Sequence, residues 1–96
     1  MEKRYPHSLA SSLTGLIQQL GIESKLKEYQ VIDKWQEIVG DKIAAVCKAE
    51  KVIEKILYVK VKSMTWRTEL LFHKAHILKN IETHVGKEII CDIRFI

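Results

Sequence analysis

Basic side chains are concentrated in the middle of the chain. They are the residues of this sequence best suited to bind a partner. Residues 42–79 carry nine Lys and Arg against three Asp and Glu, whereas residues 1–40 carry five of each. A local excess of cations favours a polyanionic partner, because each cationic side chain can neutralise a phosphate. Many basic surfaces are merely solvated, however. Nucleic-acid binding is therefore the first hypothesis, and an incidental basic face is the alternative.

The clearest strand pattern in the chain carries part of this basic charge. Residues 56–62 alternate strictly between apolar and polar side chains, which is typical of a strand with one buried face. On the polar face, lysines would neutralise phosphates and a tyrosine ring would stack on a base. No segment has the Arg, Asn and Gln content of a recognition helix, so sequence-specific readout is not expected. The expected nucleic-acid contacts are Lys48, Lys51, Lys55, Tyr58, Lys60, Lys62, Arg67 and Arg94.

The sequence holds no motif of a common catalytic or metal site. It lacks GxSxG and HExxH, and Gly40-Asp41-Lys42 lacks the leading glycine and the hydroxyl residue of a phosphate loop. His73 and His76 are neighbours on a predicted helix, but no nearby Cys or carboxylate completes a tetrahedral metal site. We therefore expect a protein that is not an enzyme and that uses no metal, cofactor or small-molecule substrate.

The cysteines and the hydropathy pattern point to the cytoplasm. Cys47 and Cys91 form no CxxC pair, and we interpret both as small buried side chains that stay reduced. The longest apolar run, residues 43–47, is far shorter than the roughly 20 residues that span a bilayer. Polar residues interrupt the N-terminal stretch, so it lacks the core of a signal peptide. We expect a cytoplasmic protein with no membrane contact.

Helical and strand periodicities predict an α+β fold with the element order α-α-β-β-α-β. Three amphipathic stretches end at Gly21, Gly40 and Gly86, and Ser63 is a plausible N-cap for the last of them. The second stretch carries an apolar set at helical spacing, consisting of Leu26, Ile32, Trp35, Ile38 and Val39. The predicted helices cover residues 9–20, 24–40 and 63–86, and the predicted strands cover residues 46–53, 56–62 and 89–96.

Three strands with one polar face need a helical layer on the other face. The helices should therefore pack on the apolar side of the strands, while Tyr58, Lys60, Lys62 and Arg94 face outward. The strand side chains that we expect to be buried are Leu57, Val59, Val61, Ile89, Ile93 and Phe95.

Four apolar residues need a separate interpretation. Trp35 lies on an amphipathic helix and should belong to the core. Trp66 follows Ser63 within one turn, so it either seals the corner between strand and helix or anchors a partner. Ile90 and Ile96 either form a mixed patch beside Arg94 or tuck under a helix, and the sequence does not decide between these.

Blocks of residues recur at characteristic spacings over most of the chain, from about Leu9 to the end. They are Trp35-x-x-Ile38-Val39-Gly40, Ile43-Ala44, Leu57-x-Val59-x-Val61-x-Ser63, Trp66-x-x-Glu69-Leu70, Gly86, Ile93 and Phe95. Together these blocks resemble the DciA family, formerly catalogued as a domain of unknown function. The resemblance implies that residues 1–96 form a single DciA-like domain.

The resemblance carries expectations about fold, partners and function. It implies a KH-like fold and a role in bacterial DNA replication, in which DciA proteins bind DNA and recruit or load the DnaB-type replicative helicase. KH domains that bind RNA clamp its backbone with a GxxG loop, and no two glycines here have that spacing. Many members also carry an extension that engages the helicase, and this sequence stops at Ile96 on a predicted strand.

Two other functions remain open. An RNA-binding KH-like module would share the fold, and competition between matched RNA and DNA oligonucleotides separates it from a DNA-binding protein. A protein-interaction domain with an incidental basic face would show no salt-sensitive nucleic-acid binding.

Overall fold

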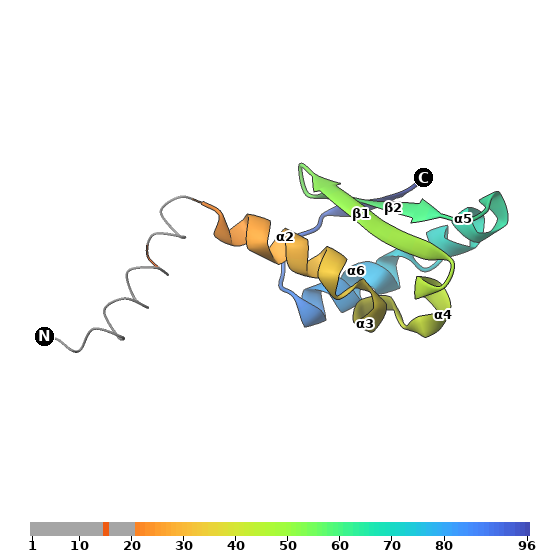
Figure 1. The fold of residues 1–96 in the computed structure, drawn as a ribbon, viewed down its shortest axis with the longest axis horizontal. Helices are drawn as coiled ribbons and strands as arrows, with labels where there is room; N and C mark the ends of the chain where they lie inside the picture. The colour runs from red at the N-terminus through yellow and green to blue at the C-terminus, as the bar shows by residue number, and fades with distance from the viewer. Residues whose placement is uncertain (1–14, 16–20) are drawn as a thin grey trace, which may run out of the picture.

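The computed structural model describes residue 15 and residues 21–96 (Figure 1). The helix expected over residues 9–20 lies outside these described residues. In chain order, the described elements are α2 Glu23–Asp33, α3 Trp35–Val39, α4 Asp41–Ala44, β1 Cys47–Ile53, β2 Ile56–Val61, α5 Met64–Leu71, α6 Lys74–His84 and β3 Asp92–Phe95.

The three strands form one mixed sheet with β2 in the centre. β1 pairs with β2 in antiparallel orientation, and β3 pairs with the other edge of β2 in parallel orientation. A tight turn at Glu54 and Lys55 joins β1 to β2, and both of these residues have positive φ angles, of 50° and 66°. The parallel strand returns only after α5 and α6, since parallel neighbours require a long crossover connection.

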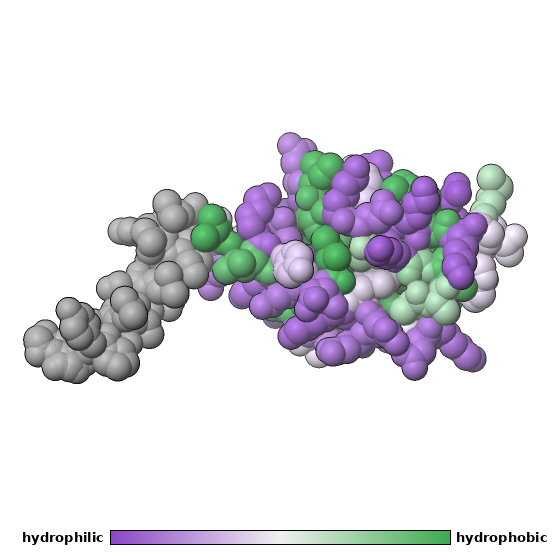
Figure 2. Space-filling view, viewed as in Figure 1, coloured by the Kyte–Doolittle hydropathy of each residue, from purple (hydrophilic) through white to green (hydrophobic). Residues whose placement is uncertain are grey.

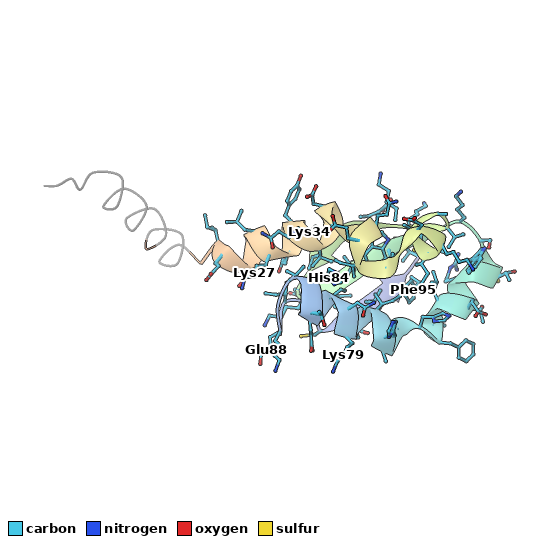
Figure 3. All side chains as sticks on the ribbon, turned by 90° about the horizontal axis from the view of Figure 1, so that it is seen from below. Lys27, Lys34, Lys79, His84, Glu88 and Phe95 are labelled. Atoms are coloured by element: carbon cyan, nitrogen blue, oxygen red, sulfur yellow. The ribbon has the colours of Figure 1, made fainter. Side chains whose placement is uncertain are left out.

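The helices form a layer on one face of the sheet (Figures 1 and 3). α2 contacts β1, α5 contacts β2 and β3, and α6 contacts β3 and α3. The Asn80 side-chain amide donates to the Ile38 carbonyl at 3.1 Å and so ties α6 to α3. The side chains that this packing removes from water most completely are Val31, Leu57, Val59, Leu70, Ile77, Ile81 and Ile93.

The α+β class and the three-stranded sheet backed by helices are confirmed. The expected burial of Leu57, Val59, Val61 and Ile93 is confirmed, and Trp35 lies in the core as expected. Ser63 caps α5 as anticipated, because its hydroxyl accepts a hydrogen bond from the Trp66 backbone N–H at 3.2 Å.

The prediction of one continuous helix over residues 63–86 is wrong, because α5 and α6 are separate. Phe72 and His73 form i→i+3 backbone bonds, to Glu69 and Leu70, that end α5 in a tighter turn. A straight helix of that length would extend roughly 36 Å, well beyond a seven-residue strand of about 23 Å. The break lets both halves pack on the same sheet and leaves Phe72 81% exposed.

The second predicted helix is likewise divided, at Lys34, into α2 and α3. The first turns of α2 extend past the sheet (Figure 1), so Leu26 is 49% exposed, although its spacing predicted the core face. Val31, which was not in the predicted set, is fully buried instead. Hydrophobic side chains gather at the exposed start of α2 (Figure 2). α4 was not predicted.

The last strand is shorter than predicted. Regular pairing covers only Asp92–Phe95, so the inside–outside alternation fails before Asp92. Ile89 and Ile90 are both buried, whereas Cys91 is exposed, which corrects the prediction that both cysteines are buried. At the end of the strand, Phe95 is half-buried (Figure 3) and Ile96 is exposed.

The helices in the described part of the chain are short. The longest of them, α2 and α6, have 11 residues each. In this part of the chain, therefore, no helix has both the length and the apolar character needed to cross a membrane.

Candidate nucleic-acid interface and apolar groove

The outer face of the sheet, which the described helices leave uncovered, carries a row of polar side chains across all three strands. Tyr58 on β2 is the register partner of Lys51 on β1 and of Arg94 on β3. Residues that are register partners project on the same face of a sheet. This row therefore brings together three of the expected nucleic-acid contacts.

A β-bulge in β1 doubles the number of lysines that this strand presents on the outer face. Ala49 pairs with Val59 and Lys51 pairs with Tyr58, so Glu50 is an extra residue. In a regular strand, side chains three residues apart point to opposite faces, but an extra residue restores them to one face. The bulge thus puts both Lys48 and Lys51 on the outer face, beside an exposed Glu50.

Lys48 and Lys60 face each other directly across the two strands as register partners. Lys62 follows two residues after Lys60, and its backbone N–H donates to the Val46 carbonyl at 2.9 Å. All three lysines are exposed, and none of them forms an ion pair with a described residue. Like charges directly opposite in a sheet destabilise it, so this lysine pair lowers the stability of the sheet.

The Tyr58 ring is less available for stacking than its outward position predicts. The Lys51 ammonium lies 5.4 Å from the centre of the ring, which is cation–π geometry. Tyr58 is also half-buried. A base that stacks on this ring face has to displace Lys51 first.

Two of the expected contacts lie off the sheet face. Lys55 is part of the turn between β1 and β2, and its carbonyl accepts a hydrogen bond from the Cys91 N–H at 2.7 Å. Arg67 lies on α5 and is half-buried, and its buried Nε has no hydrogen-bond partner among the described residues. The structure therefore brings Lys48, Lys51, Tyr58, Lys60, Lys62 and Arg94 together and places Lys55 and Arg67 at the margins.

A surface hollow lies where α4 leads into β1, next to the opposed lysines. Its volume is about 330 Å³. The Cys47 thiol donates to the Ile43 carbonyl at 3.2 Å, and burial raises the pKa of this thiol, while an interaction with the Trp35 indole opposes the rise. We call this feature the lysine hollow, and its lining residues are Ala44, Ala45, Cys47, Lys48, Lys60, Val61 and Lys62.

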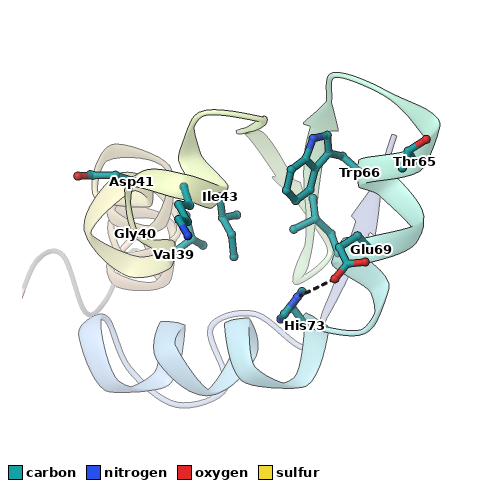
Figure 4. A pocket seen from close by; sticks show the side chains of 10 residues that line it. Val39, Gly40, Asp41, Ile43, Thr65, Trp66, Glu69 and His73 are labelled. Carbon is teal, nitrogen blue, oxygen red and sulfur yellow. Dashed lines mark ion pairs between the residues drawn. The ribbon is translucent and has the colours of Figure 1, made fainter.

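A second and larger cavity opens between the α3–α4 corner and α5 (Figure 4). Its volume is about 760 Å³, within the range of small-molecule and peptide sites. Val39 and Ile43 face Trp66 across it (Figure 4), and the fully buried Leu70 also lines it. We call it the Trp66 groove, and its remaining lining residues are Gly40, Asp41, Lys42, Thr65, Glu69 and His73.

The charges around the Trp66 groove are of both signs. Asp41 accepts a hydrogen bond from the Gln36 side-chain amide at 2.8 Å. Glu69 lies 3.5 Å from His73, a pair that is ionic only when the imidazole is protonated (Figure 4). Trp66 is 40% exposed at this groove, so it does not form a fully sealed corner between strand and helix.

Sequence reasoning missed several features of this region. Met64 and Leu71 on α5 are exposed apolar side chains close in sequence to Trp66, and Phe72 follows them. The amphipathic pattern over residues 63–86 gave no sign that a helix break would expose Phe72.

A separate ion pair fixes β3 to the start of α6. The Lys74 Nζ lies 2.8 Å from the Asp92 carboxylate. This hydrogen bond, with a backbone N–H bond from Ile93, lowers the pKa of Asp92. Within the described residues, no three His, Cys, Asp or Glu side chains gather as a metal site.

Comparisons with known proteins identify the family. A family profile described as "Dna[CI] antecedent, DciA" matches residues 8–95. A UPF0232 protein of Corynebacterium glutamicum is 34% identical over 97% of this chain and 54% of its own length. UPF0232 proteins of Rhodococcus jostii and Mycolicibacterium smegmatis are 28% and 26% identical, over 50% and 49% of their lengths. The chain thus spans about half the length of these relatives. Because the family match covers nearly all of its residues, the chain belongs to the DciA family.

Proposed function

We propose that this domain is a non-catalytic accessory of bacterial DNA replication, which binds DNA and recruits the DnaB-type replicative helicase. The outer face of the sheet would bind DNA without sequence specificity, and the Trp66 groove would dock the helicase. Binding, without covalent chemistry, would hold helicase and DNA close together.

The observation that carries the DNA half of the proposal is the set of cations that the bulge and the strand register gather on one face. Lys48, Lys60 and Lys62 are exposed and form no ion pair with a described residue. Cations that no acid neutralises can release the counterions of a phosphate backbone, which is the main source of non-specific DNA affinity.

Two facts support the helicase half. Membership of the DciA family associates the chain with loading of the replicative helicase. The Trp66 groove has apolar walls, a partly exposed tryptophan and charges of both signs, which suits a protein segment better than a polyanion. The groove is lined by the helical layer and the DNA face belongs to the sheet, so one partner need not displace the other.

Fluorescence anisotropy of labelled single-stranded, duplex and forked DNA tests the DNA half. Measurements at about 50 and 200 mM salt should show affinity falling steeply as salt rises. If the chain shows no binding even at the lower salt, DNA binding is ruled out and only protein docking remains.

An RNA-binding function is the second candidate, because the fold class is shared with RNA-binding KH domains. The absence of a GxxG sequence counts against it. Unlabelled RNA of matched length should compete for the labelled DNA no better than unlabelled DNA does, whereas stronger competition by RNA would favour this alternative.

A further inference from the structure

We propose that the lysine hollow is a subsite for one unpaired nucleotide, whose base enters the hollow while its phosphate lies among Lys48, Lys60 and Lys62. This subsite rests on the DNA-binding function proposed above. It adds to that function a binding site for a base that is not stacked in a duplex.

Small side chains create the hollow. Ala44 ends α4 and Ala45 follows as its C-cap, with its backbone N–H bonded to the Asp41 carbonyl at 3.0 Å. The next backbone N–H, of Val46, bonds to the Ile43 carbonyl at 3.0 Å, so the corner is held by the main chain. Because two alanines occupy this rigid corner, about 330 Å³ stays open beside the sheet. That volume is at the lower end of the range for small-molecule sites.

The charge of the lining fits a phosphate. Three of the seven lining residues are lysines and none is acidic. The strand register places Lys48 directly opposite Lys60, and like charges directly opposite in a sheet repel each other. An anion between them would relieve that repulsion. The apolar part of the lining, with the aliphatic stems of the lysines, gives the uncharged base a surface to contact.

The alternative place for a base on this face is already occupied. The Lys51 ammonium covers the Tyr58 ring at 5.4 Å, in a favourable cation–π contact. A base that enters the hollow displaces no such contact. In a duplex the bases are stacked and paired, so a base reaches the hollow only from single-stranded DNA or after it is flipped out.

The decisive variant is Ala45→Phe, which fills the hollow and leaves every lysine in place. Ala45 is exposed and has ordinary helical backbone angles, so the larger side chain should be tolerated. We expect affinity for an oligothymidine strand to fall about fivefold to tenfold, the lower end of the range for losing one base contact. Affinity for blunt duplex DNA should change by less than about twofold, since duplex binding uses only the phosphates.

Ala45→Ser is the matched control, because it changes the same position without filling the hollow, and it should bind both DNAs as the unaltered chain does. Equal losses for single-stranded and duplex DNA with Ala45→Phe, or no loss for either, would overturn the subsite but leave the DNA-binding function standing. Failure of the unaltered chain to bind DNA at all would overturn both.

A titration with a mononucleotide provides a second measurement that needs no variant. Thymidine monophosphate added to the ¹⁵N-labelled chain should shift the amide signals of Ala44, Ala45 and Lys62 more than inorganic phosphate does. Equal shifts from the two ligands would mean that the hollow binds a phosphate alone, and this would overturn the base contact.

Discussion

The lysine hollow and the Trp66 groove differ in charge and in the way the chain builds them. The lysine hollow lies at one corner of the sheet and has three cations and no acid in its lining. The Trp66 groove has an acid and a base on each side. Asp41 and Lys42 lie at the α3–α4 corner, whereas Glu69 lies on α5 and His73 lies just before α6. The first suits a polyanion and the second a protein surface. The two surfaces would therefore suit partners of different charge.

The largest expected effect comes from removing the aromatic anchor of the groove. Trp66→Ala should weaken binding to a DnaB-type helicase by about 30-fold or more, because buried tryptophan anchors typically contribute 2 kcal/mol or more to an interface. DNA affinity should not change. Biolayer interferometry with immobilised helicase measures the first quantity, and anisotropy measures the second.

Phe72→Ala is the matched control for Trp66→Ala. Phe72 is 81% exposed and does not line the groove, so its loss should leave helicase affinity within about twofold of the unaltered chain. If both variants lose helicase binding equally, the contact is a general apolar surface of α5 and not the groove.

The next largest effect is expected at the sheet. The double substitution Lys60→Glu and Lys62→Glu should lower DNA affinity about tenfold at low salt and reduce the salt-dependence slope by about 2. Helicase binding should persist. The matched control is the double substitution Lys79→Glu and Lys87→Glu, which makes the same change in net charge at two other exposed residues. Lys79 projects from α6 away from the sheet (Figure 3). Equal losses in both double variants would mean that net charge, and not this face, attracts DNA.

A smaller effect is expected at the turn that sets the register of the basic face. Glu54 and Lys55 have positive φ angles that suit Asn and Gly at a two-residue hairpin turn. Replacing them with Asn and Gly should raise the free energy of unfolding by roughly 1 kcal/mol. Urea denaturation measures this, and helicase binding should not change. A loss of stability would show that the side chains at this turn make contacts that outweigh its backbone strain.

The smallest effect concerns the ion pair between Lys74 and Asp92. Because both side chains are partly exposed, Asp92→Asn should cost less than about 1 kcal/mol at neutral pH. The ion pair with Lys74 lowers the pKa of Asp92 in the folded state. Its stabilisation is therefore fully present above the unfolded-state pKa of about 3.9, and it is lost as the pH falls through the lower, folded-state pKa. The difference between Asp92→Asn and the unaltered chain should therefore vanish at low pH in urea denaturation. A difference that is unchanged in acid would rule out this explanation.

The sheet could largely be predicted from the sequence, because strand alternation is local. The period of two in residues 56–62 correctly assigned Leu57, Val59 and Val61 to the core. The pattern could not show the bulge at Glu50, since an extra residue in β1 is defined only against its partner strand. For the same reason the shared face of Lys48 and Lys51 was not evident.

The Trp66 groove was not predictable, because it depends on tertiary packing. Its walls come from the α3–α4 corner and from α5, which are more than 20 residues apart in sequence. The helix break after Leu71 also depends on fitting both halves to the sheet, and amphipathic periodicity does not report it. Trp66 itself was identified as a candidate anchor, but its surroundings were not.

The most direct test of the separation between the two surfaces is a ¹⁵N–¹H NMR titration of the chain with single-stranded DNA of about 15 nucleotides. The largest amide shifts should fall on Lys48, Lys51, Lys60, Lys62 and Arg94, with little change at Val39, Ile43, Trp66 and Leu70. Shifts centred on the groove residues, or spread evenly over α6, would contradict the assignment of DNA to the sheet and of the helicase to the groove.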